Sequence, residues 1–229
     1  MRILFIRHGQ PNYEKDCLTD VGLRQAKDTA LRLQDEGIQA VYSSPFGRAR
    51  ETAECTAEIL GLPVIILPFM RELYWGNNEG KPVFHHGHPW ETANELMRRG
   101  YDLTAPNWAS HPIFENNVVV EDAARVGREI DGWMAGLGYE HDGHYYRCAE
   151  AGHPGAVALF SHGGSSVAAL SRIFNLTFPY LCATMHEPFC GITVARFTDQ
   201  LDEPALPCLE LANDGRHIRG ECYHRLAEM

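Results

Sequence analysis

Apolar residues in this chain follow two kinds of spacing that alternate along the sequence. Short unbroken apolar runs are typical of strands buried on both faces of a parallel sheet. Between these runs, apolar residues recur every three or four positions, which is the spacing of one helix face. The runs cover residues 3–6, 39–42, 64–67 and 156–160, and the helical spacing covers about 19–37, 48–60, 123–137 and 165–174.

Helix-ending residues and two late runs complete the predicted order of elements. We expect Thr19 to cap the first helix, Gly37 to end it and Gly61 to end the second. Apolar residues at 192–197 and 208–212 predict two further strands. Strands that alternate with helices predict a three-layer α/β/α sandwich around a mostly parallel sheet. A length of 229 residues fits one domain, residues 1–229.

Two segments break this alternation. Residues 74–117 hold three of the four tryptophans, several prolines and a histidine cluster, with one short helical stretch near 91–99. We interpret this segment as a small cap inserted over the core. Residues 138–155 are rich in glycine and histidine, and we expect them to form a loop.

Composition narrows the classes of function. Apolar residues make up 45 % and charged residues 22 %, so a packed core is expected. A net charge of −10 argues against binding to nucleic acid or to a membrane surface, although a locally basic pocket could still hold an anionic substrate. The seven cysteines are odd in number and form no CxxC pair. With no apolar run near the roughly 20 residues of a membrane span, these features predict a reduced, cytoplasmic protein.

Candidate chemistry lies at the carboxyl ends of two predicted strands. The run at 3–6 continues into Arg7-His8-Gly9, and the run at 156–160 continues into Ser161-His162-Gly163-Gly164. Ligands of open parallel sheets bind at this edge. The two histidines are therefore expected to face each other across one crevice, where glycine lets a ligand approach the backbone closely.

Two further segments carry charge at the same predicted edge. Arg48 and Arg50 open the helix that follows the second strand, and helix N-termini attract anions. Arg48 lies closer to the helix start and is the better ligand candidate. Arg50 could equally pair with Glu54 on a solvated face. After the third strand, Glu72 is a candidate general acid, although alone it would be an ordinary surface carboxylate.

Together these segments resemble the histidine phosphatase superfamily, in its phosphoglycerate mutase-like branch (branch 1). Five motifs occur in the family's order, and a late segment resembles its C-terminal strand ending. The motifs are Arg7-His8-Gly9-Gln10; Leu18-Thr19 with Gly22 and Gln25-Ala26; Ser43-Ser44 with Arg48-Ala49 and Thr52-Ala53; Arg71-Glu72-Leu73; Ser161-His162-Gly163-Gly164; and, late in the chain, Asn213-Asp214 with His217.

The resemblance implies a role for each candidate. His8 would attack as a neutral imidazole and carry the phosphoryl group, with its other ring nitrogen donating to a carbonyl. Glu72 would donate the proton. Arg7, Arg48 and a protonated His162 would hold the phosphoryl oxygens, so that no metal and no cofactor are needed. Further phosphate or substrate contacts would come from Gln10, Asn12 and Gly163.

Several departures from the family pattern shape the expected activity. Asn12 stands four residues after the nucleophile instead of about six, and Gln10 replaces the glutamate of glycolytic mutases. The segment Asn78-Glu79-Gly80 replaces Trp-Glu-Gly, which makes Glu79 a second candidate proton donor. The cap offers only Lys81, Arg98 and Arg99 as strong cations, whereas a bisphosphorylated cofactor would want more. We therefore expect a phosphatase acting on a small phosphorylated metabolite.

Three alternatives stay open at this point. The first is a phosphoglycerate mutase-type phosphotransferase, and the second is a non-catalytic phosphate-binding regulatory module. The third is a metal site at the histidine clusters His85-His86-Gly87-His88 or His141-Asp142-Gly143-His144, although no HExxH motif is present. The aromatic residues of the cap could form a wall for an organic leaving group or could pack its own core. The sequence does not fix the oligomeric state, and a homodimer is compatible with it.

Overall fold

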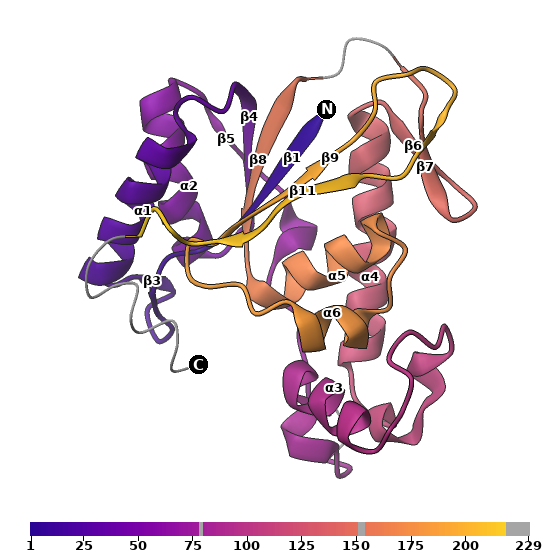
Figure 1. Ribbon diagram of the computed structural model, residues 1–229. Coiled ribbons are helices and arrows are strands. Elements are labelled where there is room, and N and C mark those ends of the chain that lie inside the picture. The colour runs from indigo at the N-terminus through magenta and orange to yellow at the C-terminus, as the bar shows by residue number, and fades with distance from the viewer. Residues whose placement is uncertain (78–79, 151–153, 219–229) are drawn as a thin grey trace.

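The protein was analysed as a computed structural model, which describes residues 1–77, 80–150 and 154–218. Its centre is a six-stranded sheet in the order β11-β9-β1-β8-β4-β5 (Figure 1). Four adjacent strands, β1, β8, β4 and β5, are parallel, and β9 runs antiparallel to both β1 and β11. The predicted mostly parallel sheet is confirmed. Its strands are β1 (Arg2–Arg7), β4 (Ile38–Ser43), β5 (Val64–Ile66), β8 (Ala156–Ser161), β9 (Ile192–Arg196) and β11 (Cys208–Asp214).

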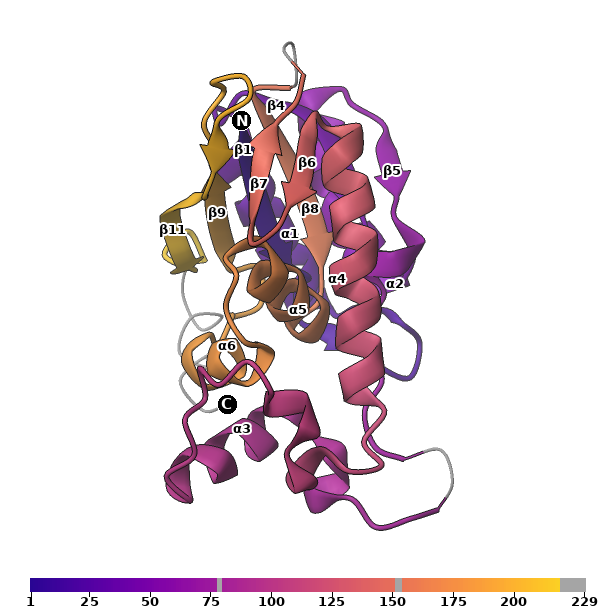
Figure 2. The same cartoon turned by 90° about the vertical axis from the view of Figure 1, so that its right-hand side faces the viewer.

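Helices cover both faces of the sheet, which confirms the three-layer sandwich. Helices α1 (Asp20–Leu33) and α2 (Gly47–Leu60) cover one face, and α4 (Val119–Gly136), α5 (Gly163–Ile173) and α6 (Phe178–Thr184) lie on the other (Figures 1 and 2). Strand β1 explains why its sequence is an unbroken apolar run. Ile3 and Phe5 pack into the core under α4 and α5, whereas Leu4 and Ile6 pack into the core under α1 and α2.

The predicted helix ends are formed by specific local contacts. The Thr19 hydroxyl accepts a hydrogen bond from the backbone N–H of Gly22 at 3.0 Å, as an N-cap does. Gly61 ends α2 in the left-handed conformation with φ of 65°. Gly37 has φ of 69° but lies a few residues beyond the end of α1 at Leu33.

The segment at 74–117 lies at one end of the molecule, beside α6 and the first turn of α4 (Figure 2). It contains α3 (Pro89–Arg98), which packs against α6, and three single turns of 3-10 helix. The buried Asn117 ties this segment together, because its side chain accepts from Gly76 N–H and donates to the Gly87 carbonyl. The turns are η2 (Phe84–Gly87), η3 (Trp108–Ser110) and η4 (Pro112–Phe114), and a fourth, η1 (Pro68–Met70), precedes the segment.

The prediction of a loop at 138–155 is wrong. The described part of it forms a hairpin of β6 (Tyr139–Asp142) and β7 (Tyr145–Cys148), to which β10 (Pro204–Ala205) adds a third strand. The physical reason is alternation: Tyr139 and Tyr146 are buried, whereas the residues between them are largely exposed. Gly143 turns the hairpin with φ of 62°. Helix α6 was also not predicted from the sequence.

Two other expectations concern the chain as a whole. The six cysteines within the described residues are all free thiols, and Cys222 lies outside that part of the chain. Among the described helices, none combines the length and the apolar character that crossing a bilayer requires.

Candidate active site

Two histidines meet at one edge of the sheet because their strands are neighbours in register. Strands β1 and β8 are parallel, with Arg7 opposite Ser161, so the residues that follow each strand emerge side by side. The His8 and His162 ring centroids lie 5.1 Å apart in an edge-to-face arrangement. Both side chains are buried. The structure therefore brings together the two histidines that the sequence placed at strand ends.

His8 is held as a neutral imidazole with a defined tautomer. Its Nδ1 lies 2.7 Å from the carbonyl oxygen of Gly9, which only a protonated ring nitrogen can approach favourably. Nε2 is then the nitrogen with the free electron pair. Burial, with added repulsion from the Arg7 and Arg48 charges, holds the pKa of His8 well below its usual range.

The loop that carries His8 packs directly on the backbone of α1. A Cβ atom added to Gly9 would lie 2.6 Å from the Gly22 carbonyl oxygen, and one added to Gly22 would lie 2.1 Å from the Gln10 carbonyl oxygen. Side chains cannot fit at either position without moving the loop. Gly22, the glycine of the second motif, therefore allows the loop that carries His8 to pack on α1.

Arg48 lies in the first turn of α2 and points at His8. Its Nε–H donates to His8 Nε2 at 3.3 Å, so the electron pair of the imidazole is engaged in this unliganded arrangement. Asp16 fixes the guanidinium by accepting from Arg48 Nη1 at 2.5 Å, and also accepts from the Gly47 backbone N–H at 2.7 Å. One carboxylate thus caps the N-terminus of α2 and orients Arg48.

Arg7 and His162 each present a buried nitrogen that has no partner in the described part of the chain. These atoms are Arg7 Nε and His162 Nδ1. Arg7 Nη1 donates to the Glu187 carbonyl oxygen, and its guanidinium lies 4.5 Å from the centre of the Phe189 ring. Unpartnered buried polar atoms are unfavourable, so two of them beside His8 indicate a place where a polar group of a ligand belongs.

His162 differs from the expectation in its charge. Its Nε2 lies 2.7 Å from the Ser44 hydroxyl, which leaves Nδ1 for a ligand. Burial, reinforced by His8 and the two arginines, holds the pKa of His162 well below its usual range. This lowered pKa favours an uncharged ring at neutral pH, whereas the expected contact to the phosphoryl group is from a protonated ring. A dianionic phosphoryl group beside it would favour protonation.

Glu72 reaches the same edge from the segment after η1. Its Oε1 accepts from the backbone N–H groups of Leu73 at 2.9 Å and Ser165 at 3.1 Å. A Cβ atom on Gly164 would lie 2.6 Å from this oxygen, so that glycine makes room for the carboxyl group. Burial raises the pKa of Glu72 although Arg7 and these N–H groups oppose the rise. A carboxyl that keeps its proton more readily suits a general acid.

The neighbouring Arg71 is anchored away from the site. It makes two hydrogen bonds to the Asp122 carboxylate, at 2.9 and 2.7 Å. Asp122 also accepts from Arg125 and from the Tyr74 backbone N–H. These donors outweigh burial and lower the pKa of Asp122 to about 2. Arg71 and Asp122 thus hold the segment that carries Glu72 on α4.

Comparison with known proteins shows the family of the chain. The model of the histidine phosphatase superfamily (branch 1) matches residues 3–204. The chain belongs to this superfamily. The curated relative "Probable phosphoglycerate mutase GpmB" of Yersinia pestis (strain Pestoides F) is 33 % identical over 92 residues, which are 36 % of this chain and 43 % of the relative. The match thus spans less than half the length of such relatives.

Solved structures of the superfamily share the fold over almost the whole chain. One is mycobacterial glucosyl-3-phosphoglycerate phosphatase Rv2419c with VO3, at 21 % identity and a TM-score of 0.60, covering 93 % of this chain and 98 % of that one. Another is Entamoeba histolytica phosphoserine phosphatase with 3-phosphoglyceric acid, at 20 % identity and 0.62, covering 95 % and 99 %. Shigella flexneri alpha-ribazole phosphatase matches at 20 % and 0.60, covering 94 % and 97 %.

Several other candidate residues make hydrogen bonds or ion pairs within the protein. The Gln10 side chain accepts from the Thr19 hydroxyl at 2.9 Å, and Asn12 Oδ1 accepts from Lys15 N–H at 3.2 Å. Late in the chain, His217 Nε2 lies 3.0 Å from the Thr29 hydroxyl. Arg50 is exposed, with Glu54 3.6 Å away. Glu79 lies outside the described residues.

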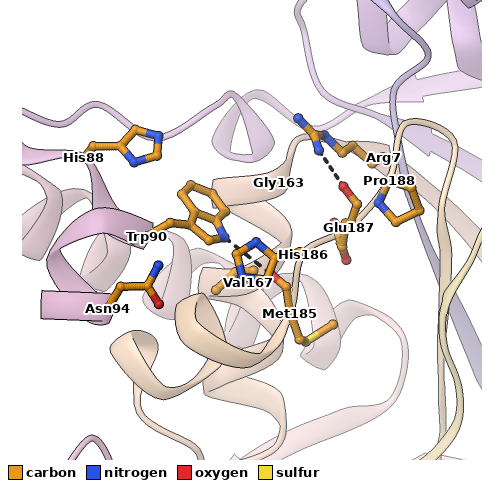
Figure 3. Close-up of a pocket in the computed structure, with 10 residues that line it drawn as sticks. All are labelled: Arg7, His88, Trp90, Asn94, Gly163, Val167, Met185, His186, Glu187 and Pro188. Carbon is orange, nitrogen blue, oxygen red and sulfur yellow. Dashed lines mark hydrogen bonds between the residues drawn. The ribbon is translucent and has the colours of Figure 1, made fainter. Parts of the chain in front are cut away.

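A cavity of about 360 Å³ opens beside Arg7 and Gly163, between α3 and the segment that follows α6 (Figure 3). This volume suits a small organic group. The cap contributes part of its wall and the core contributes the rest. The lining residues are Arg7, His88, Trp90, Asn94, Gly163, Val167, Met185, His186, Glu187 and Pro188.

The histidine clusters do not come together as a metal centre within the described ranges, where no three His, Cys, Asp or Glu side chains converge suitably. His85 Nδ1 lies 3.4 Å from Glu91, and His88 lines the cavity. His141 stacks edge-on against Tyr146, with ring centroids 5.0 Å apart.

Sequence reasoning missed several residues that shape the site. Asp16, which holds Arg48, and Asp122, which holds Arg71, stand in segments without a motif. Glu187 and Phe189 flank Arg7 from the segment between α6 and β9. A possible signal was the carboxylate at Glu187, which stands among apolar residues just before a predicted strand.

Proposed function

We propose that the protein is a phosphatase that hydrolyses a small phosphomonoester through a phosphohistidine at His8, without a metal ion. One observation carries the proposal. A neutral His8, with Nδ1 bonded to the Gly9 carbonyl, lies among Arg7, Arg48 and His162. This set can position a phosphoryl group and balance its charge, which is most of what phosphoryl transfer requires. The free thiols are consistent with a cytoplasmic location.

The first half of the reaction forms the phosphoenzyme. The phosphoryl oxygens displace Arg48 from His8 Nε2 and take its donors, together with Arg7 Nε and His162 Nδ1. Nε2 then attacks phosphorus, the bond from phosphorus to the ester oxygen breaks, and the Glu72 carboxyl gives its proton to that oxygen. An alcohol leaves, and Glu72 becomes a carboxylate.

The second half restores the enzyme. The Glu72 carboxylate takes a proton from a water molecule, whose oxygen attacks phosphorus as the phosphorus–nitrogen bond breaks. Inorganic phosphate leaves, and His8 returns to the neutral imidazole. Because both halves use the same carboxyl, its raised pKa suits both states.

Charge in the cap favours hydrolysis over mutase chemistry, which the curated relatives leave as the second candidate. Arg98 and Arg99 lie on the outer side of α3, where both pair with Glu95. Among the described residues that line the cavity, Arg7 is the only arginine, and no lysine is present. A bisphosphorylated cofactor carries several negative charges and would need more cations than this.

We expect the purified protein to release inorganic phosphate from 4-nitrophenyl phosphate and from a panel of phosphorylated metabolites in the presence of EDTA. Its own arginines supply the charge that a metal would otherwise provide. Interconversion of 2- and 3-phosphoglycerate, measured in parallel, is expected to be slow beside the best hydrolysis. Faster interconversion than hydrolysis would favour the mutase, and loss of activity in EDTA would overturn metal independence.

We expect kcat/KM to be highest on the acidic side of neutrality. The rate should rise with pH as His8 loses its proton, at a pH below the usual histidine range. It should fall with further increase in pH as the raised pKa of Glu72 is passed and the acid loses its proton. A pH profile at constant ionic strength measures both limbs. A rate that climbs steadily into the alkaline range would contradict these assignments.

A further inference from the structure

The cavity beside Arg7 contains a carboxyl group that the proposed reaction does not use. Glu187, between α6 and β9, is 6 % exposed, and neither of its carboxyl oxygens has a hydrogen-bond partner among the described residues. Figure 3 shows it on the Arg7 side of the cavity. Buried polar groups normally have partners, so a ligand is expected to supply one here.

The charges around Glu187 indicate what kind of partner is missing. Burial and the nearby Glu72 raise the pKa of Glu187 to about 8, against the opposing charge of Arg7. A carboxyl with this pKa is largely protonated at neutral pH. A phosphoryl group bound at Arg7 would neutralise that positive charge. Among the described residues, no other arginine and no lysine lines the cavity to balance an ionised Glu187.

Trp90 offers a second contact that favours a cation. Its Nε1–H donates to the Met185 carbonyl at 3.3 Å, which fixes the ring, and the ring lines the cavity next to His88. The face of a tryptophan ring attracts cations. A carboxyl that lacks a partner and an aromatic face on one cavity together suit an organic ammonium group.

We propose that the substrate is a phosphorylated amino alcohol, whose ammonium group binds between the Glu187 carboxylate and the Trp90 ring. This inference rests on the proposed function, because it places the phosphoryl group at Arg7 and His8. On binding, the ammonium group donates to the ionised carboxyl and stabilises it. Glu187 then has the hydrogen-bond partner that the described residues do not supply. Glu187 is thus a residue that determines specificity.

The spacing of the two subsites limits the length of the substrate. The Glu187 backbone carbonyl accepts from Arg7 Nη1, so Glu187 lies directly beside the phosphate-binding guanidinium. A Cβ atom on Gly163 would lie 3.5 Å from the Trp90 ring and 3.8 Å from Arg7 Nε. Phosphate and ammonium are therefore joined by a short linker, of about two or three carbons by these contacts.

The test uses two phosphonates that are not hydrolysed and differ only in the terminal group. We expect 2-aminoethylphosphonate to bind the wild-type protein at least about tenfold more tightly than propylphosphonate, since a charge-assisted contact in a buried site is worth this much. Isothermal titration calorimetry measures both. Equal affinities in the wild-type protein would overturn the inference without any variant.

Two variants assign the preference to its residues. In Glu187→Gln the ratio of the two affinities is expected to fall to about threefold or less, and in Trp90→Leu it should fall in part. Glu121→Gln, at an exposed carboxylate on α4, removes the same charge elsewhere and should keep the wild-type ratio. A full preference in a folded Glu187→Gln protein would contradict the role of this carboxyl.

Turnover separates the two proposals. Release of phosphate from 4-nitrophenyl phosphate without any preference for 2-aminoethyl over propyl phosphate would overturn the ammonium subsite and keep the phosphatase. Absence of phosphate release from every ester, with the phosphonate preference intact, would overturn the phosphatase and keep the subsite.

Discussion

A His8→Ala variant is expected to lose phosphate release by at least about 10⁴-fold, because removing a nucleophile removes the covalent route itself. Water would have to attack phosphorus directly, although Arg7, Arg48 and His162 could still bind the phosphoryl group. The variant should also form no acid-labile phosphoenzyme when mixed with substrate and quenched. Phosphate release and acid-lability of protein-bound phosphate measure the two effects.

An exposed histidine provides the control for this variant. His144 lies in the β6–β7 turn, outside the site motifs, and its side chain is exposed. His144→Ala should keep both activity and phosphoenzyme. Turnover near the wild-type rate in a folded His8→Ala protein would show that the proposed nucleophile is wrong.

A Glu72→Gln variant is expected to lose about 10²- to 10⁴-fold in kcat/KM on an alkyl phosphate, which is the usual contribution of a general acid. The loss should be much smaller on 4-nitrophenyl phosphate, because 4-nitrophenolate leaves readily without a proton. This dependence on the leaving group separates proton donation from mere distortion, which would slow both substrates alike. Steady-state kinetics on both substrates give the comparison.

Glu79 is the matched control, because the sequence made it the second candidate for the same role. Its position lies outside the described residues. Glu79→Gln should leave the ratio of the two substrates as in the wild-type protein. The opposite pattern, with the ratio changed by Glu79→Gln and not by Glu72→Gln, would transfer the role of proton donor.

The parts of the site that the sequence predicted share one property: each stands where a regular element ends. Arg7 ends β1 and His8 follows it, His162 follows β8, and Arg48 lies in the first turn of α2. Parallel register then brings strand ends to one edge without further information, so their proximity could be inferred before any coordinates. The sandwich itself followed from the alternation of buried runs with amphipathic helices.

The parts that were missed depend on contacts between distant segments. Glu187 meets Arg7 across 180 residues of chain, and Asp122 meets Arg71 across 51. No local spacing encodes such pairs. The β6–β7 hairpin could not be predicted for another reason. Its glycine and histidines are typical of a loop, although the side chains of Tyr139 and Tyr146 are buried on one face of the hairpin.

The order of strands in the sheet has a consequence for how the molecule is made. Strand β1 ends directly before His8, the proposed nucleophile, and lies between β8 and β9, which are synthesised about 150 and 190 residues later. Contacts this far apart in sequence form slowly. On the ribosome, strand β1 therefore remains unpaired, with its apolar side chains exposed, until most of the chain has emerged. The proposed active site is therefore completed late in synthesis, and until then the nascent chain exposes apolar surface of the kind that chaperones bind.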